Sequence, residues 1–130
     1  MIIRGTTPYQ HFLLPMKVNE ISEIYVTYLQ NDEIIIEKDK TDMTLINIED
    51  LLENASMGED LDIEYTEEYL NSCQLTVHLS QEDTLKFHFY PAAEKNIAVI
   101  QIRLLTSDGE AYASDPIHER IFGVLKDGVI

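Results

Sequence analysis

The sequence has little cysteine, no tryptophan and few basic residues. Its one cysteine, Cys73, excludes an intrachain disulfide and gives no sign of an oxidising compartment, so we expect a thiol that packs as a small apolar residue. Nine Lys and Arg residues stand against 24 Asp and Glu, for a net charge of −15. This balance argues against binding to nucleic acid or to anionic membranes, and we expect protein partners.

Long apolar runs are also missing. Gly5 and Pro8 interrupt the N-terminus before an apolar segment of signal-peptide length forms. No stretch approaches the roughly 20 apolar residues that a membrane span requires. We expect a protein of the cytoplasm, or one that is incorporated there into a larger particle.

The length and apolar content of the sequence fit one folded domain. A chain of 130 residues fits one domain, and an apolar fraction of 45% with seven Tyr and four Phe is enough to build a core. No repeat or linker divides the sequence. We predict one β-sandwich domain over residues 1–130, interrupted by an acidic insert at about 47–72.

Alternation of apolar and polar residues predicts most of the strands. It is clear over 9–14, 23–30, 33–38, 74–80 and 96–105. A short further strand is expected over 41–46, an antiparallel return over 110–114 and a bent last strand over 117–125. The long apolar segment 96–105 is expected to be the central strand. Residues expected to point into one shared apolar layer are Ile24, Val26, Leu75, Val77, Ile100 and Ile102.

Turn and cap residues define the remaining elements. Asn31-Asp32 predicts a two-residue hairpin turn, after which Ile34 and Ile36 should share a face. Helical spacing over 47–54 predicts one or two helical turns behind Asn47, and the capping-box spacing of Ser80 to Asp83 predicts another turn. Residues 60–69 are interpreted as an edge strand, and Asp115-Pro116 should interrupt the last strands.

About seven short strands with these turns predict an all-β fold, an immunoglobulin-like antiparallel β-sandwich with a short helical insert. The Cys and Trp of antibody domains are missing, so only the architecture is expected.

Few residues indicate a catalytic or metal-binding site. No nucleophile has a base nearby in the sequence, and the four histidines lack the spacing of a helical zinc motif. The stretch from Asp60 resembles a calcium loop, but its sixth position is Tyr65 rather than Gly and its twelfth is Asn71 rather than Glu. We therefore expect no enzyme, no catalytic residue, no cofactor and no metal, with a weak divalent site among these carboxylates as an open alternative.

Binding is better supported. No Lys or Arg occurs from Thr41 to Leu85, which predicts a strongly negative surface. Six tyrosines are candidates for an interface, although each also suits a half-buried strand position: Tyr25, Tyr28, Tyr65, Tyr69, Tyr90 and Tyr112. The candidate interaction surface comprises Arg4, Tyr25, Glu59, Asp60, Asp62, Glu64, Tyr65, Glu67, Glu68 and Tyr69. The arm 1–8 either adds a strand to a neighbour's sheet or forms the first edge strand of its own sheet.

The sequence resembles small uncharacterised proteins encoded among the virion genes of phages and prophages of Gram-positive gut bacteria. The resemblance is carried by residues 1–8, 12–15, 26–31, 79–87, 100–109 and 113–115, whereas the acidic insert and the segment past Ile117 depart from that pattern. It implies a structural or accessory component of a phage particle, and it carries no catalytic residues to this chain.

Two functions remain from the sequence. The first is a non-catalytic interaction module in the head, neck or tail of a phage particle, which contacts other particle subunits or further copies of itself and is made in the host-cell cytoplasm. The second is an acidic cytosolic protein that occupies a basic partner as a nucleic-acid mimic, as the stretch without Lys or Arg indicates. An enzyme is the weakest hypothesis.

Overall fold

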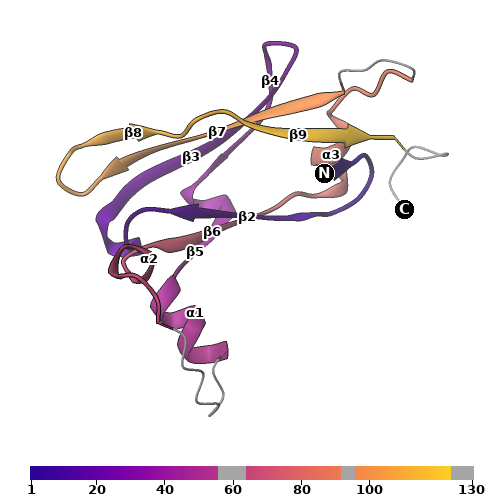
Figure 1. Cartoon of the computed structure of the whole chain (residues 1–130). Coiled ribbons are helices and arrows are strands. Elements are labelled where there is room, and N and C mark those ends of the chain that lie inside the picture. The colour runs from indigo at the N-terminus through magenta and orange to yellow at the C-terminus, as the bar shows by residue number, and fades with distance from the viewer. Residues whose placement is uncertain (56–63, 92–95, 124–130) are drawn as a thin grey trace.

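The computed structural model describes residues 1–55, 64–91 and 96–123, and these form two β-sheets in two layers (Figure 1). The strands are β1 (Ile2–Ile3), β2 (Tyr9–Leu14), β3 (Ile21–Gln30), β4 (Glu33–Asp39), β5 (Met43–Asn47), β6 (Cys73–His78), β7 (Ile97–Thr106), β8 (Ala111–Ala113) and β9 (Ile117–Phe122). The helices are α1 (Ile48–Ala55), α2 (Glu67–Leu70) and α3 (Gln81–Leu85), and short 3-10 turns cover Val18–Glu20 and Lys40–Asp42. The prediction of a mainly β fold is confirmed.

The larger sheet has the strand order β1-β9-β7-β3-β4, with β8 paired to β7 next to β9. One edge of β7 pairs with β3, and its other edge pairs first with β9 and then with β8. The prediction of a central strand here is confirmed. The expectation of a wholly antiparallel fold is wrong, because β1 and β9 pair in parallel.

The smaller sheet has the order β2-β6-β5 and is antiparallel throughout. The core lies between the two sheets, and the six residues expected to share one apolar layer are 0% to 4% exposed. One polar contact crosses this core: the hydroxyl of Tyr28 on β3 donates a hydrogen bond to Oε1 of Gln10 on β2, at 2.7 Å. Tyr28 is fully buried, so of the two alternatives given for this tyrosine the structure favours the strand position and not the interface.

The hairpin of β3 and β4 forms as predicted, but a bulge shifts which residues of β4 face the core. Asn31 and Asp32 have φ values of 51° and 62°, the left-handed conformation that a two-residue type I′ turn requires. The register shifts between Tyr28 and Leu29, since Tyr28 pairs with Ile36 and Leu29 with Ile34. Because of this bulge Ile36 is buried and Ile34 is 60% exposed, so the prediction that they share a face is wrong.

From residue 48 on, the described part of the acidic insert contains two helices and no strand. Helix α1 confirms the helical prediction for 47–54, and Oδ1 of Asn47 accepts a hydrogen bond from the backbone N–H of Val18. The edge strand expected over 60–69 is wrong for its described part, which is irregular from residue 64 and then forms α2. The hydroxyl of Thr66 caps α2 by accepting a hydrogen bond from the N–H of Tyr69, and two glutamates occupy the first turn, where the helix dipole favours them.

The N-terminal arm is the first strand of its own sheet. Ile2 is fully buried beside β9. The buried hydroxyl of Thr84 on α3 accepts a hydrogen bond from the N–H of Gly5 and donates one to the carbonyl of Thr6. Helix α3 begins with the predicted capping box, in which Ser80 and Asp83 exchange side-chain to backbone hydrogen bonds of 3.0 Å each.

Candidate functional site

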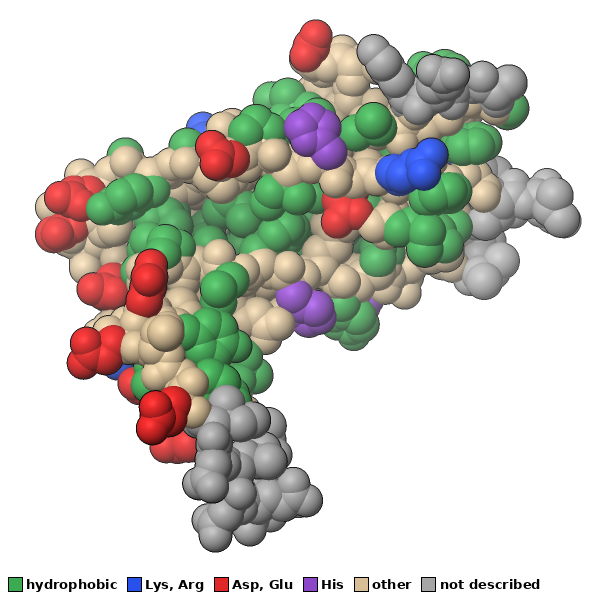
Figure 2. Space-filling view, in the orientation of Figure 1, with side chains coloured by type: hydrophobic (Ala, Val, Ile, Leu, Met, Phe, Trp, Pro, Cys, Tyr) green, Lys and Arg blue, Asp and Glu red, His purple; other side chains and the backbone are tan. Residues whose placement is uncertain are grey.

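An apolar groove of about 410 Å³ opens between the two sheets. Ligand pockets in proteins measure roughly 300–1,000 Å³, so the groove has the size of a binding site. Its lining consists of residues 11–16, residues 112–114, Ile102, Leu104 and Ile117. Figure 2 shows hydrophobic side chains along a hollow between the two layers.

Two strand edges border this groove. Side chains of consecutive strand residues point to opposite faces, yet consecutive residues of β2 and of β8 line the cavity, which therefore meets the edges of both strands. Within the described part of the chain, β2 pairs only with β6 and β8 only with β7. Backbone N–H and C=O groups on the outer sides of β2 and β8 are thus open for pairing.

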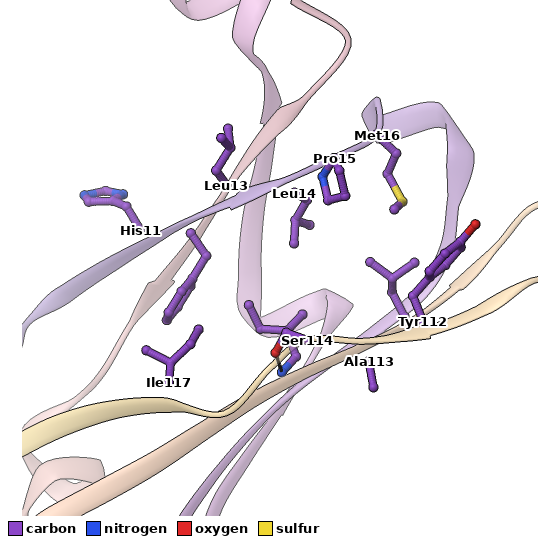
Figure 3. Close-up of a pocket in the computed structure, with 12 residues that line it drawn as sticks. His11, Leu13, Leu14, Pro15, Met16, Tyr112, Ala113, Ser114 and Ile117 are labelled. Atoms are coloured by element: carbon purple, nitrogen blue, oxygen red, sulfur yellow. Dashed lines mark hydrogen bonds between the residues drawn. The ribbon is translucent and has the colours of Figure 1, made fainter. Parts of the chain in front are cut away.

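The side chains divide into a floor and a rim. In Figure 3, Leu14 and Met16 reach into the groove from one side and Tyr112 from the other, while Leu13 points away from it. Leu14 is 4% exposed, whereas Leu13 is 57% and Tyr112 49% exposed. Large apolar side chains exposed next to an apolar cavity are typical of an interaction site.

Ser114 fixes the larger sheet where it meets the groove. Its N–H donates to the carbonyl of Ile102 at 2.8 Å, and its Oγ accepts from the N–H of Ile102 at 2.9 Å. Both backbone groups of Ile102 therefore have partners, although the ladder stops between β8 and β9 at Asp115 and Pro116, as predicted. The break separates β8 from β9 without leaving buried polar groups unpaired at Ile102.

One end of the groove continues into an acidic pocket of about 290 Å³, with which it shares Pro15, Met16 and Tyr112. The acidic residues lining this pocket are Glu20, Asp108 and Glu110. A hydrogen bond from the Thr106 hydroxyl lowers the pKa of Asp108, so this carboxylate is ionised at neutral pH. The hydroxyl of Tyr112 donates to Glu110 at 2.6 Å, which raises the pKa of Tyr112.

Part of the predicted interaction surface lies close to the groove. A further pocket near α2 is lined by Leu13 and Pro15 together with Glu68 and Tyr69. Tyr65 stacks on Tyr69 with 5.6 Å between the ring centroids. Glu64 and Glu67 are exposed beside them, so five of the predicted residues gather at this end of the molecule. Glu59, Asp60 and Asp62 lie outside the described residues.

The other two predicted residues lie elsewhere. Nη2 of Arg4 donates to the carbonyl of Leu85 at 3.2 Å, so this side chain joins the arm to the end of α3. Tyr25 is half-buried on β3 with the guanidinium of Arg103 5.6 Å from its ring centroid. The structure therefore does not bring Arg4 and Tyr25 together with the residues at α2.

Sequence reasoning missed most of the groove. The sequence indicates Tyr112 only as one of six candidate tyrosines, and it does not mark Leu13, Pro15 or Met16 as binding residues. The available signal was Leu13, an apolar residue on the outward face of a predicted strand. The groove itself depends on how β2 and β8 come together, and no local pattern encodes that.

Of the potentially reactive side chains, His11 and Ser114 line the groove, where they are hydrogen-bonded to Thr76 and Ile102. Cys73 and His78 do not line it. Cys73 is fully buried, and burial raises the pKa of its thiol to about 11, which disfavours the nucleophilic thiolate. His78 stacks on Tyr9 with 3.9 Å between ring centroids. Among the described residues, no three His, Cys, Asp or Glu side chains form a group that would hold a metal ion.

Comparisons with family models, curated proteins and solved structures found no match to this chain. Within the ranges that the structure describes, no helix has the length and apolarity needed to cross a membrane. The function is therefore argued from the groove and its surroundings.

Proposed function

We propose that this chain is a non-catalytic interaction module that binds a protein partner in the groove between β2 and β8. The observation that carries the proposal is the apolar cavity bordered by two strand edges that lack partner strands in the described part of the chain. Such edges pair readily with another chain, and an apolar floor supplies the free energy of burial.

The setting proposed for this module is the head, neck or tail of a phage or prophage particle, after synthesis in the host-cell cytoplasm. The resemblance to virion-gene proteins supports this setting, and so does a site suited to contacts with other subunits or with a second copy. Repeated copies in a particle would allow weak contacts to add up.

A second candidate function is an acidic binding protein that occupies a basic partner, as a mimic of nucleic acid. It is favoured by the carboxylates near α2 and the β7–β8 turn, which gather at one end of the molecule in Figure 2. Both proposals are compatible with an immunoglobulin-like sandwich, which the arrangement of two β-sheets in two layers supports.

Gel filtration with light scattering tests the first proposal. The purified chain is measured alone over a concentration range, and then with the products of its flanking genes. Leu13→Lys adds a charge at the groove rim, and Ile34→Lys is the matched control, because the two side chains are 57% and 60% exposed and Ile34 lies on the distant β3–β4 hairpin.

We expect assembly with itself or with a particle protein that Leu13→Lys abolishes and Ile34→Lys preserves. A strict monomer that joins no particle protein and captures a basic host protein would favour the second candidate. Assembly that both variants lose equally, or that neither loses, contradicts binding in the groove.

A further inference from the structure

We propose that the groove receives an extended segment of the partner protein, which adds as a strand to the free edge of β2 and ends in Lys or Arg at the acidic pocket. This inference rests on the proposed function, since it specifies how the partner is recognised. It commits to a peptide whose side chains alternate between apolar and polar and whose basic end lies nearest Asp108 and Glu110.

The backbone of β2 supports strand addition. Residues 11–14 of this strand all line the cavity, and among the described residues β2 is paired along one edge, with β6. In an antiparallel pair, every second residue directs its N–H and C=O away from the partner strand, so the outer edge of β2 presents such groups to the groove. Pro15 has no N–H and ends this edge.

The side chains of the groove set the pattern of the added strand. Phe12 and Leu14 lie on the core face of β2, and Leu13 lies on its outer face. A strand paired beside β2 would direct alternate side chains toward Phe12 and Leu14 in the apolar cavity. The intervening side chains would lie on the outer face near Leu13, where polar residues are tolerated.

Charge fixes the direction of the segment. Past Pro15 and Met16 the cavity is lined by Glu20, Asp108 and Glu110, and no Lys or Arg lines either pocket in the part of the chain described. The net charge of −15 adds to this negative potential. A basic residue at that end is attracted, whereas an acidic one, or the phosphates of nucleic acid, would be repelled.

The test uses a labelled heptapeptide of alternating valine and threonine that ends in two lysines, titrated by fluorescence anisotropy. Control peptides end in two glutamates, or carry N-methyl groups on alternate amides. Asp108→Asn/Glu110→Gln neutralises the acidic pocket, and Asp32→Asn/Glu33→Gln makes the same exchange in the β3–β4 turn. Hydrogen exchange compares β2 with β5, the opposite edge of the same sheet.

We expect saturable, salt-sensitive binding of the lysine peptide that Asp108→Asn/Glu110→Gln weakens about tenfold and the control variant leaves within about twofold. Both control peptides should bind at least about tenfold more weakly, and exchange should slow in β2 but not in β5. Equal effects of the two double variants, or binding without protection of β2, would overturn the inference.

A small amphiphile tests whether the groove binds a small cationic ligand instead of a peptide. If dodecyltrimethylammonium binds with the same dependence on Asp108 and Glu110 while the peptide fails, the site recognises a small amphiphilic cation and strand addition is wrong. If the peptide fails but Leu13→Lys still abolishes assembly with a partner, the interaction function stands and only this mode of recognition is refuted.

Discussion

The side chain of Gln30 anchors the segment that follows α3. It is 2% exposed, its Nε2 donates to the carbonyl of His88 at 2.6 Å, and its Oε1 accepts from the N–H of His88 at 2.7 Å. Gln30→Ala should lower the free energy of unfolding by about 3 kcal/mol, because it leaves two backbone groups unpaired and opens a cavity. Urea unfolding measures this.

Gln101→Ala is the control for that prediction. Gln101 is half-buried, and within the described residues its side chain makes one long hydrogen bond of 3.4 Å, to the carbonyl of Ser114. We expect a loss below about 1 kcal/mol there. Equal losses at the two positions would show that the pairing of Gln30 with His88 adds nothing.

Tyr28 should make the protein sensitive to alkali. Burial, with smaller contributions from Glu119 and Asp83, raises the pKa of Tyr28 well above its ordinary value. In the unfolded chain the phenol ionises near pH 10, so the stability it provides is complete below about pH 10 and is lost as pH rises further. Tyr28→Phe removes this loss.

At neutral pH Tyr28→Phe should cost about 1–2 kcal/mol, because Gln10 loses the hydrogen bond that crosses the core. Urea unfolding of both proteins on either side of about pH 10 measures the two effects. A fall in stability with pH that is the same in both proteins would contradict the role given to Tyr28.

Among the elements, α3 is joined to β4 by one buried carboxylate. Oδ2 of Asp83 accepts from the N–H of Ser80 and lies 2.9 Å from Nζ of Lys38. Burial alone would raise the pKa of Asp83, but the bonds from Ser80 and Lys38 outweigh it and lower the pKa below its ordinary value. The stability it provides is therefore present above the pKa of an unfolded Asp and is lost as pH falls through the folded value.

Asp83→Asn should lower stability at neutral pH by about 1–2 kcal/mol, through the loss of the charged partner of Ser80 and Lys38. The difference from wild type should shrink below about pH 4. Thermal unfolding at neutral and acid pH measures it, with Asp115→Asn, at an exposed position outside the helices, as the control. A difference that is independent of pH would rule out this account of Asp83.

The β3–β4 turn is an element in which one substitution should increase stability. Asp32 has a φ of 62°, which glycine adopts without strain and which Asn-Gly turns of this type favour. Asp32→Gly should therefore raise the free energy of unfolding by about 0.5–1 kcal/mol. A loss of stability in urea unfolding would mean that the Asp32 side chain contributes more than its backbone strain costs.

At the scale of the whole molecule, local patterns predicted the strands better than their pairing. The alternation in 23–30 and 96–105 placed Ile24, Val26, Ile100 and Ile102 in the core correctly, because one buried face determines the phase of a strand. The bulge beside Ile34 and the parallel pairing of Ile2 with Ile121 were not predicted. Both depend on contacts across the fold that no local period specifies.

In the candidate site, too, local sequence predicts some features and not those that depend on strand pairing. The acidic residues near α2 follow from composition, since no Lys or Arg occurs from Thr41 to Leu85. The groove forms only because β2 and β8, about a hundred residues apart in the chain, end up as facing edges of two different sheets. Burial patterns describe faces of strands, and they carry no information about which edges remain unpaired.

The central claim is that a partner protein lies in the groove between the two sheets, and site-specific photocrosslinking in the producing cells tests it most directly. A benzoylphenylalanine at position 13 stands at the rim of the groove, and one at position 34 is equally exposed on the distant hairpin. We expect illumination to join position 13, and not position 34, to one protein of the particle or to a second copy of this chain. Equal labelling at both positions, or none at position 13, would contradict the claim.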